Sequence, residues 1–172
     1  MFLNYIKDYF VKKTLKKSFQ NLKNNESVNV VKTIGLLVDG TRFAKTEALI
    51  AALTANGILP ENITTIVYRD KFKKTADKKF PVFNSGHLKW NGEISSPEVN
   101  DFINKKFDLL ISYYDIEKAI LLKINHDSKA QFKVGFSLID NRLNHFMIKT
   151  YVDNYTLFVS ELFKYLKLLN KL

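Results

Sequence analysis

Two aspartates in this chain follow apolar runs, and this placement is typical of a ligand site in an α/β protein. Asp39 follows residues 34–38, and Asp115 follows residues 109–114. In an open parallel sheet, ligands bind beyond the carboxyl ends of the strands. If the two strands are neighbours, the carboxylates could hold a metal ion or act as an acid–base pair. The polar residues placed at such strand ends are Asp39, Gly40, Thr41, Tyr114, Asp115 and Ser137.

Ordinary structural roles also explain both aspartates. Asp39-Gly40 is common turn chemistry, and Asp115 is placed to cap the helix predicted after it. The sequence favours these roles, and a ligand crevice is the alternative.

No familiar catalytic or cofactor motif supports the crevice. Residues 38–48 contain one glycine and match neither G-x-G-x-x-G nor G-K-[ST], although Thr41 and the following helix could bind an isolated anion. The three histidines show no metal-ligand spacing, and G-x-S-x-G does not occur. We therefore expect no metal site and no cofactor, and the sequence favours a protein without enzymatic activity.

Two short segments hold most of the excess positive charge, which is +10 for the whole chain. Residues 1–24 contain six lysines and one aspartate, and residues 69–79 contain six basic residues and two aspartates. Segregated charge of this kind indicates an anionic partner. The basic residues concerned are Lys7, Lys12, Lys13, Lys16, Lys17, Lys23, Arg69, Lys71, Lys73, Lys74, Lys78 and Lys79.

Both segments have features of phosphate-contacting surfaces. Lysines 12, 13, 16 and 17 lie on adjacent turns of one predicted helix face, where each can meet a phosphate as a point charge. In residues 69–74, Phe72 is interleaved with basic residues. Such contacts position a protein on a nucleic-acid backbone without reading sequence.

Two other interpretations of the basic segments are open. A lysine-rich helix face is often only a solvated face, and a basic amphipathic helix can lie on an anionic membrane. The second basic segment favours RNA over a membrane, because a membrane-surface helix does not require a distant basic loop.

Length and composition bound the class of protein. A chain of 172 residues with 46% hydrophobic residues is expected to form one ordinary domain with a substantial core. The absence of cysteine excludes disulfides and thiolate metal sites, and it suits a cytoplasmic location. No apolar run is long enough to span a bilayer, and the first residues lack the features of a signal peptide.

The pattern of apolar residues predicts three parts: a basic amphipathic helix over 2–23 within residues 1–24, a linker over 25–32, and a single α/β domain over 33–172. Within the domain, strands are predicted at 33–38, 63–68, 80–83, 108–113, 132–136 and 144–148. Helices are predicted at 43–56, from Ser96-Pro97-Glu98 onward, at 116–124 and after a cap at Asp153.

The alternation of strands and helices predicts a three-layer sandwich around a mostly parallel, Rossmann-like sheet of five or six strands. Residues 138–149 are expected to pair antiparallel at an edge of this sheet.

Several segments resemble an uncharacterised family of small basic proteins from Bacteroidota, a domain of unknown function. They are residues 108–115 (DLLISYYD), 133–137 (KVGFS) and 141–147 (NRLNHFM), together with the basic N-terminal helix. The resemblance covers nearly the whole chain and implies no activity and no catalytic residues. The first β-α-β unit is also similar to the opening domain of two-domain glycosyltransferases, whose donor-binding domain has no counterpart here.

From these features we expect a cytoplasmic, RNA-facing protein without enzymatic activity, associated with the ribosome (rRNA and possible ribosomal-protein neighbours) or another structured RNA. Its helix 2–23 and loop 69–79 would contact phosphates. The alternative is a small-ligand-binding protein or enzyme that uses the strand-end crevice. A third reading is docking of helix 2–23 on a membrane surface or a protein partner.

Overall fold

The fold is taken from a computed structural model that describes residues 30–71 and 79–172. Helix 2–23, most of the linker and residues 72–78 of the basic loop lie outside the described residues. The strands are β1 (Ile34–Asp39), β2 (Ile63–Tyr68), β3 (Val82–Phe83), β4 (Leu109–Tyr113), β5 (Phe132–Phe136) and β6 (Phe146–Ile148). The α-helices are α2 (Thr46–Ala55), α3 (Pro97–Asn104), α4 (Ala119–Asp127) and α5 (Tyr155–Leu168), and short 3-10 helices are η2 (Pro60–Asn62), η3 (Ser85–His87) and η4 (Asn141–Leu143).

All six strands form one parallel sheet in the order β3-β2-β1-β4-β5-β6. This is the strand order of the doubly wound Rossmann-like fold, so the predicted fold class is confirmed. β1 lies at the centre, and its six residues are all buried, which explains their nearly continuous apolar run.

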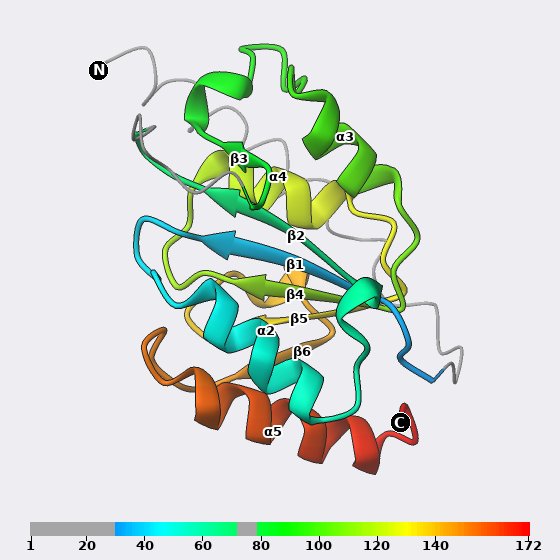
Figure 1. The fold of residues 1–172 in the computed structure, drawn as a ribbon. Helices are drawn as coiled ribbons and strands as arrows, with labels where there is room; N and C mark the ends of the chain where they lie inside the picture. Colours follow the sequence, from blue (N-terminus) through cyan, green and yellow to red (C-terminus); the bar gives the residue numbers. More distant parts are fainter. Residues whose placement is uncertain (1–29, 72–78) are drawn as a thin grey trace.

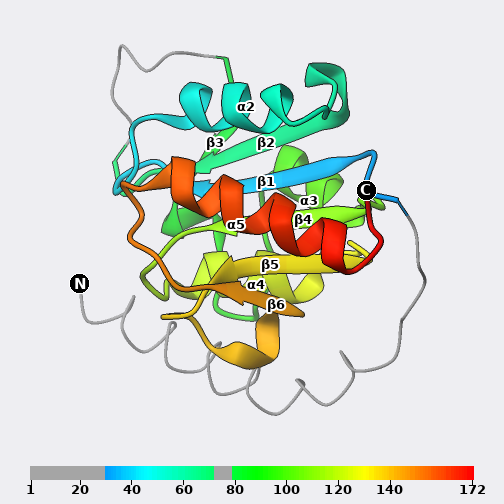
Figure 2. The ribbon, with the colours of Figure 1, turned by 90° about the horizontal axis from the view of Figure 1, so that it is seen from below.

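Helices cover both faces of the sheet. α2 and α5 pack together on one face, and α3 and α4 pack together on the other (Figures 1 and 2). An aromatic cluster of Phe43, Tyr113, Phe136 and Phe158 fills the space under α5, with ring centroids about 5 Å apart. Among the described residues, no helix is both long and apolar enough to cross a membrane.

Helix boundaries that depend on local signals are confirmed. Ser96 caps α3, where its hydroxyl accepts from the Val99 amide, and Pro97 occupies the first helical position. α2 ends at Ala55 with Asn56 as its C-cap, and Gly57 follows with a φ of +97°.

Other boundaries differ from the prediction. α2 begins at Thr46 instead of residue 43, because Asp39 holds the intervening residues in a turn through its bonds to Thr41 and Phe43. Asn154, and not Asp153, caps α5 by accepting from the Leu157 amide.

The expected antiparallel pairing of residues 138–149 is wrong. β6 runs parallel to β5, and the chain reaches it through a short crossover that contains η4. The Asp140 side chain caps η4 by accepting from the Arg142 amide, and Leu143 is fully buried beneath it. These anchors turn the chain back before it re-enters the sheet.

Candidate functional site

The carboxyl ends of β1 and β4 form the topological switch point of the sheet. The two strands are neighbours, as the crevice prediction requires. The chain leaves β1 toward α2 on one face and leaves β4 toward α4 on the other (Figure 1). In sheets of this type the connections diverge at this position and leave room for a ligand.

Asp39 lies at the switch point and is fully buried. Its Oδ1 accepts from the Thr41 amide at 3.0 Å, and its Oδ2 lies 2.8 Å from Nζ of Lys118. The second contact is only an ion pair: Asp39 Oδ2 accepts no hydrogen bond. A buried carboxylate requires such a partner, since an uncompensated charge is costly to bury.

Lys118, which follows β4, connects its own loop to the loops after β1 and β2 at the switch point. Its ammonium also bonds Asp70 Oδ1 at 3.1 Å and lies 4.3 Å from the ring centre of Tyr68. The Asp70 amide donates to Thr41 Oγ1 at 2.9 Å, and the Tyr68 hydroxyl donates to Asp70 Oδ1 at 2.8 Å. We call Asp39, Thr41, Tyr68, Asp70 and Lys118 the switch-point cluster.

Hydrogen bonding fixes the charges of the cluster. Burial would raise the pKa of Asp70, but hydrogen bonds from Tyr68 and Lys118 outweigh it and lower this pKa below its ordinary value. Burial, followed by the bond to Asp70, raises the pKa of Tyr68. At neutral pH Asp70 is therefore ionised and Tyr68 keeps its proton.

The second predicted carboxylate has its own cation. Asp115 pairs with Arg42 at 3.3 Å, and this bond raises the pKa of Arg42. Asp115 does not cap the helix after β4, because α4 begins four residues later, at Ala119, with Lys118 at its N-cap. Since Asp39 and Asp115 are each neutralised by a separate cation, they do not form a shared acid–base pair.

The other predicted crevice residues lie in different surroundings. Gly40 is held against β2: a Cβ there would come within 2.4 Å of Val67 Cγ1, so only glycine fits without movement. Tyr114 is fully buried, and its hydroxyl accepts from Asn125 of α4. Ser137 is exposed beyond β5. The structure thus brings together Asp39, Gly40 and Thr41 with Asp115, but not Tyr114 or Ser137.

The stems of the basic loop are attached to the same edge of the sheet. Arg69 donates its amide to Phe83, Asp70 joins the switch-point cluster, and Lys79 pairs with Glu47 of α2 at 3.0 Å. Of the predicted phosphate-contacting residues, only Arg69, Lys71 and Lys79 are described. The others, at positions 7, 12, 13, 16, 17, 23, 73, 74 and 78, lie outside the described residues.

A second group of basic side chains gathers at the opposite, amino edge of the sheet, and the sequence-based prediction missed it. The segments that enter the strands there contribute four lysines and two carboxylates, Glu61 and Asp108, and the C-terminal segment after α5 contributes a fifth lysine. We call Lys32, Lys105, Lys106, Lys129 and Lys171 the amino-edge lysines. They come from four separate segments, so no charge run reveals them. Listing the residues that precede each predicted parallel strand would have found all of them except Lys171, which follows α5.

Backbone hydrogen bonds connect the segments that contribute the amino-edge lysines. The Lys32 amide donates to Asp108 Oδ2 at 3.0 Å, the Lys129 amide to the Ile103 carbonyl at 3.1 Å, and the Val31 amide to the Lys171 carbonyl at 2.8 Å. The same Asp108 oxygen also accepts from the amide and hydroxyl of Thr33. Burial alone would raise the pKa of Asp108, but these bonds keep it below its ordinary value.

One buried lysine was also missed. Lys133 of β5 is 2% exposed, and its Nζ donates to the carbonyls of Asn125 (2.5 Å) and His126 (3.1 Å) at the end of α4. Burial lowers its pKa to about 8, although the charge of Asp127 opposes this effect. Lys133 thus satisfies carbonyl groups that the helix end leaves without partners.

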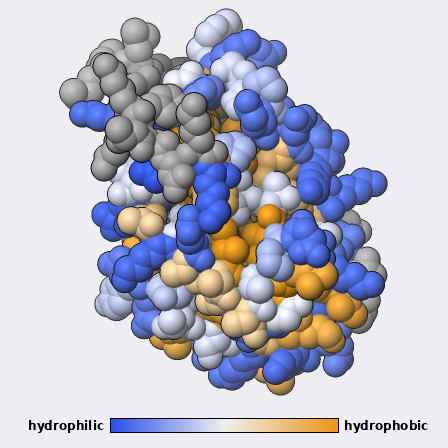
Figure 3. All heavy atoms as spheres, viewed as in Figure 1, coloured by the Kyte–Doolittle hydropathy of each residue, from blue (hydrophilic) through white to orange (hydrophobic). Residues whose placement is uncertain are grey.

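Two hollows lie away from the switch point. One, of about 790 Å³, lies between α2 and α5, with lysines 164 and 167 among its lining residues. In Figure 3, hydrophobic side chains reach the surface in this part of the molecule. The other, of about 520 Å³, lies between α3, α4 and the loop before α3. Within residues 30–71 and 79–172, no three His, Asp or Glu side chains group in a way that could hold a metal ion.

Comparison with known families places the chain. A family of unknown function, DUF6913, matches residues 7–169. The chain belongs to the DUF6913 family. The match includes both the loop 69–79 and most of the N-terminal basic segment, so in DUF6913 these segments accompany the α/β domain. No curated protein and no solved structure matches the chain.

Proposed function

We propose that this DUF6913 protein is a cytoplasmic RNA-binding protein without enzymatic activity that associates with the ribosome or another structured RNA. Helix 2–23 and loop 69–79 contact phosphates, and the α/β domain is the scaffold. The amino-edge lysines extend the phosphate-binding surface beside the point where the N-terminal segment joins the domain.

The observation that carries the proposal is a contrast between carboxylates that are bonded within the domain and lysines at the amino edge that are not. Asp39, Asp108 and Asp140 are engaged with backbone amides or cations of the domain itself. By contrast, Lys32, Lys106 and Lys129 are exposed and form no ion pair with a described carboxylate. The outward field at the amino edge is therefore positive, and such a field attracts polyanions.

The position of the two basic segments favours a large, folded RNA. The N-terminal segment joins the domain at Val30, beside the start of β1, whereas loop 69–79 leaves from the end of β2. These edges are separated by the length of a six-residue strand, roughly 20 Å at about 3.3 Å per residue. An RNA that contacts both edges must extend over at least that distance.

Salt-dependent binding tests the proposal. Binding of purified protein to a ribosomal RNA fragment should weaken steeply as potassium chloride rises, because each phosphate contact adds about 0.7 to 0.9 to the log–log slope. Lys106→Glu with Lys129→Glu should weaken binding and lower the slope. Lys164→Glu with Lys167→Glu, which makes the same charge change on α5, serves as the matched control.

Three results would count against RNA as the partner. They are affinity that does not change with salt, an equal loss in the two double variants, and tighter binding to anionic lipid vesicles than to RNA. The last result would instead support membrane docking of the N-terminal segment.

A second candidate function is supported by the switch-point cluster. A buried aspartate paired with a partly exposed lysine lies where sheets of this strand order bind ligands. We infer from it that a small phosphorylated ligand could bind here, with Lys118 and Arg42 as its cationic contacts.

Thermal shift with inorganic phosphate and nucleoside diphosphates tests this site. A stabilisation present in wild type and absent in Arg42→Gln would support it, since Arg42 is half exposed and its loss leaves the buried pair intact. A stabilisation of equal size in both proteins, or none in either, would remove the support.

A further inference from the structure

Trp90, the only tryptophan of the chain, stands at the tip of a short hairpin and is 87% exposed. Leu88 and Ile94 pair at the base of the hairpin and are buried. The Lys89 amide donates to Glu93 at 2.8 Å, the Gly92 amide donates back to Lys89 at 3.0 Å, and Gly92 takes a φ of +85°. The turn is therefore fixed, and the largest apolar side chain of the protein is held in solvent by a rigid support.

This exposure is unusual for tryptophan. Large aromatic side chains are buried on average, and where they are not, they concentrate at binding hot spots. A fixed hairpin also reduces the entropy lost on binding, because the side chain is already presented.

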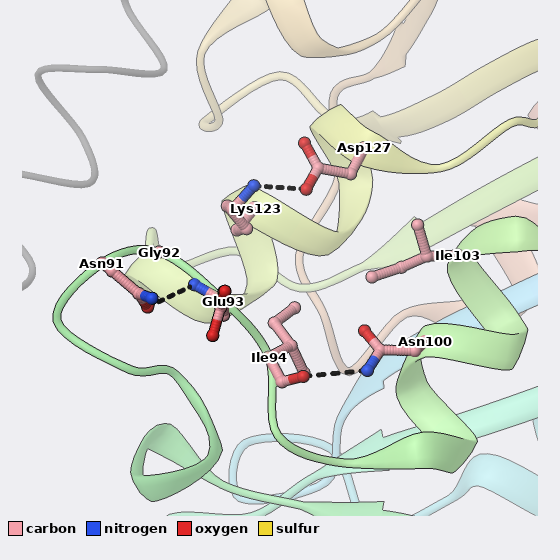
Figure 4. Close-up of a pocket in the computed structure, with 8 residues that line it drawn as sticks. All are labelled: Asn91, Gly92, Glu93, Ile94, Asn100, Ile103, Lys123 and Asp127. Carbon is pink, nitrogen blue, oxygen red and sulfur yellow. Dashed lines mark hydrogen bonds and ion pairs between the residues drawn. The ribbon is translucent and has the colours of Figure 1, made fainter.

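A hollow of about 520 Å³ begins at the residue after Trp90. Its size lies within the range of about 300 to 1,000 Å³ that is usual for small-molecule sites. Asn91, Gly92, Glu93 and Ile94 of the hairpin form one wall, and α3 and α4 form the others (Figure 4). The walls are close together, since a Cβ at Gly92 would lie 3.7 Å from Lys123 Cε of α4.

The lining of the hollow is polar, and each of its ionic groups is paired with a group of opposite charge, one of which (Lys89) lies outside the lining. Lys123 pairs with Asp127, and Glu93 pairs with Lys89, so the ionic groups neutralise one another. Ile94 and Ile103, both slightly exposed, supply apolar surface. Asn100 donates its amide nitrogen to the Ile94 carbonyl at 2.8 Å and turns its oxygen toward the hollow (Figure 4). This lining suits an uncharged group with an apolar face and polar edges.

Positive charge lies immediately beside this hollow. Ile103, one of its lining residues, accepts the backbone hydrogen bond from Lys129, an amino-edge lysine. Lys106 follows two residues after the end of α3. A phosphate held by these lysines would place the attached nucleoside next to the hollow.

We propose that Trp90 and the adjacent hollow bind unpaired bases of RNA: the indole, which lies outside the lining of the hollow, is a stacking face, and the Asn100 amide is a contact to the polar edge of a base in the hollow. The inference rests on the proposed function and names the part of the RNA that this surface takes. Unpaired bases are commonly recognised by stacking on aromatic side chains and by hydrogen bonds to their edges.

Intrinsic fluorescence tests the site directly, because Trp90 is the only tryptophan. Titration of the full chain with a single-stranded oligonucleotide should quench its emission to a saturating limit. Trp90→Ala should weaken oligonucleotide binding about 5- to 150-fold, the range expected for loss of one base–aromatic stack, and should leave the salt slope unchanged. Trp90→Phe should recover most of the affinity.

Tyr151→Ala is the matched control, since Tyr151 is an aromatic residue with 83% exposure outside the hollow. If RNA binds with the same salt-dependent affinity to wild type and Trp90→Ala, without quenching, the base site is wrong and the proposed function stands. If no RNA binds at all, both fail. Self-association that disappears in Trp90→Ala would make Trp90 a contact between copies of this chain and would also overturn the base site.

Discussion

At the residue scale, the lysine with the most perturbed pKa in the part of the chain that the structure describes is Lys133. Its ammonium is enclosed between β5 and the end of α4, where two backbone carbonyls accept its hydrogen bonds. Burial disfavours the charged form, so the pKa of Lys133 falls to about 8 in the folded chain, against 10.5 as its ordinary value. The protein therefore stabilises a lysine that releases its proton in a mildly alkaline range.

This shift predicts how stability depends on pH. Between pH 8 and pH 10.5 the unfolded chain binds more protons at this residue than the folded chain, so the free energy of unfolding should rise with pH. The full effect is on the order of 3 kcal/mol, at about 1.4 kcal/mol per pH unit. Above about pH 10 the trend should reverse, because Tyr68, Tyr113 and Tyr114 then lose their protons in the unfolded chain but keep them in the folded chain, where their pKa values are raised.

Urea unfolding at a series of pH values measures this dependence. In Lys133→Met, which keeps the length of the side chain and removes its charge, the rise between pH 8 and pH 10 should disappear. The comparison concerns the slope, since the substitution also leaves two carbonyls without donors. An equal slope in both proteins would show that Lys133 titrates as an ordinary exposed lysine.

At the element scale, the structure shows which boundaries a sequence can predict. The start of α3 and the end of α2 were predictable, because Ser96-Pro97 and Asn56-Gly57 act through bonds within a few residues. The start of α4 was not, because the residues before it have distant partners. Asp115 pairs with Arg42, and Lys118 pairs with Asp39 and Asp70. These contacts hold residues 116–118 out of the helix that the sequence predicts over 116–124.

The direction of β6 was likewise not predictable from the residues of the strand itself. Its short apolar run is compatible with either direction, and the direction is decided by η4, whose cap and buried Leu143 lie on the crossover. Likewise, the sequence placed Tyr114 at the carboxyl end of its strand, but only packing decides that its side chain lies under α4 and away from the crevice.

At the scale of the whole molecule, the parallel topology determines which segments lie together at each edge of the sheet. An all-parallel sheet receives every connection at the same edge, so segments 30–33, 105–108 and 128–131 enter it side by side, and the C-terminal segment 169–172 is bonded to the first of them. The order β3-β2-β1-β4-β5-β6 likewise brings Asp39 beside the start of the α4 connection. The alternation of elements predicted a parallel sheet, but strand order depends on which side each crossover returns to, and no local pattern encodes this.

The opposite placement of the basic segments predicts how binding energy is divided. If one folded RNA contacts both edges, charge reversal at the amino edge (Lys106→Glu with Lys129→Glu) and charge removal in the loop (Lys73→Gln with Lys74→Gln) should each weaken binding. The losses in the logarithm of affinity should add, because the amino edge and the edge that holds the stems of loop 69–79 are about 20 Å apart. An oligonucleotide too short to span the sheet should not show this addition, since it occupies one edge at a time.

Anisotropy titrations of the four proteins with both RNAs give the required comparison. Additive losses for the folded RNA, together with less than additive losses for the short one, would establish a single binding surface that runs across the domain. If one pair of substitutions leaves the affinity for the folded RNA unchanged, binding is instead confined to the other edge. The edge without effect would then be an ordinary solvated surface, as lysine-rich faces often are.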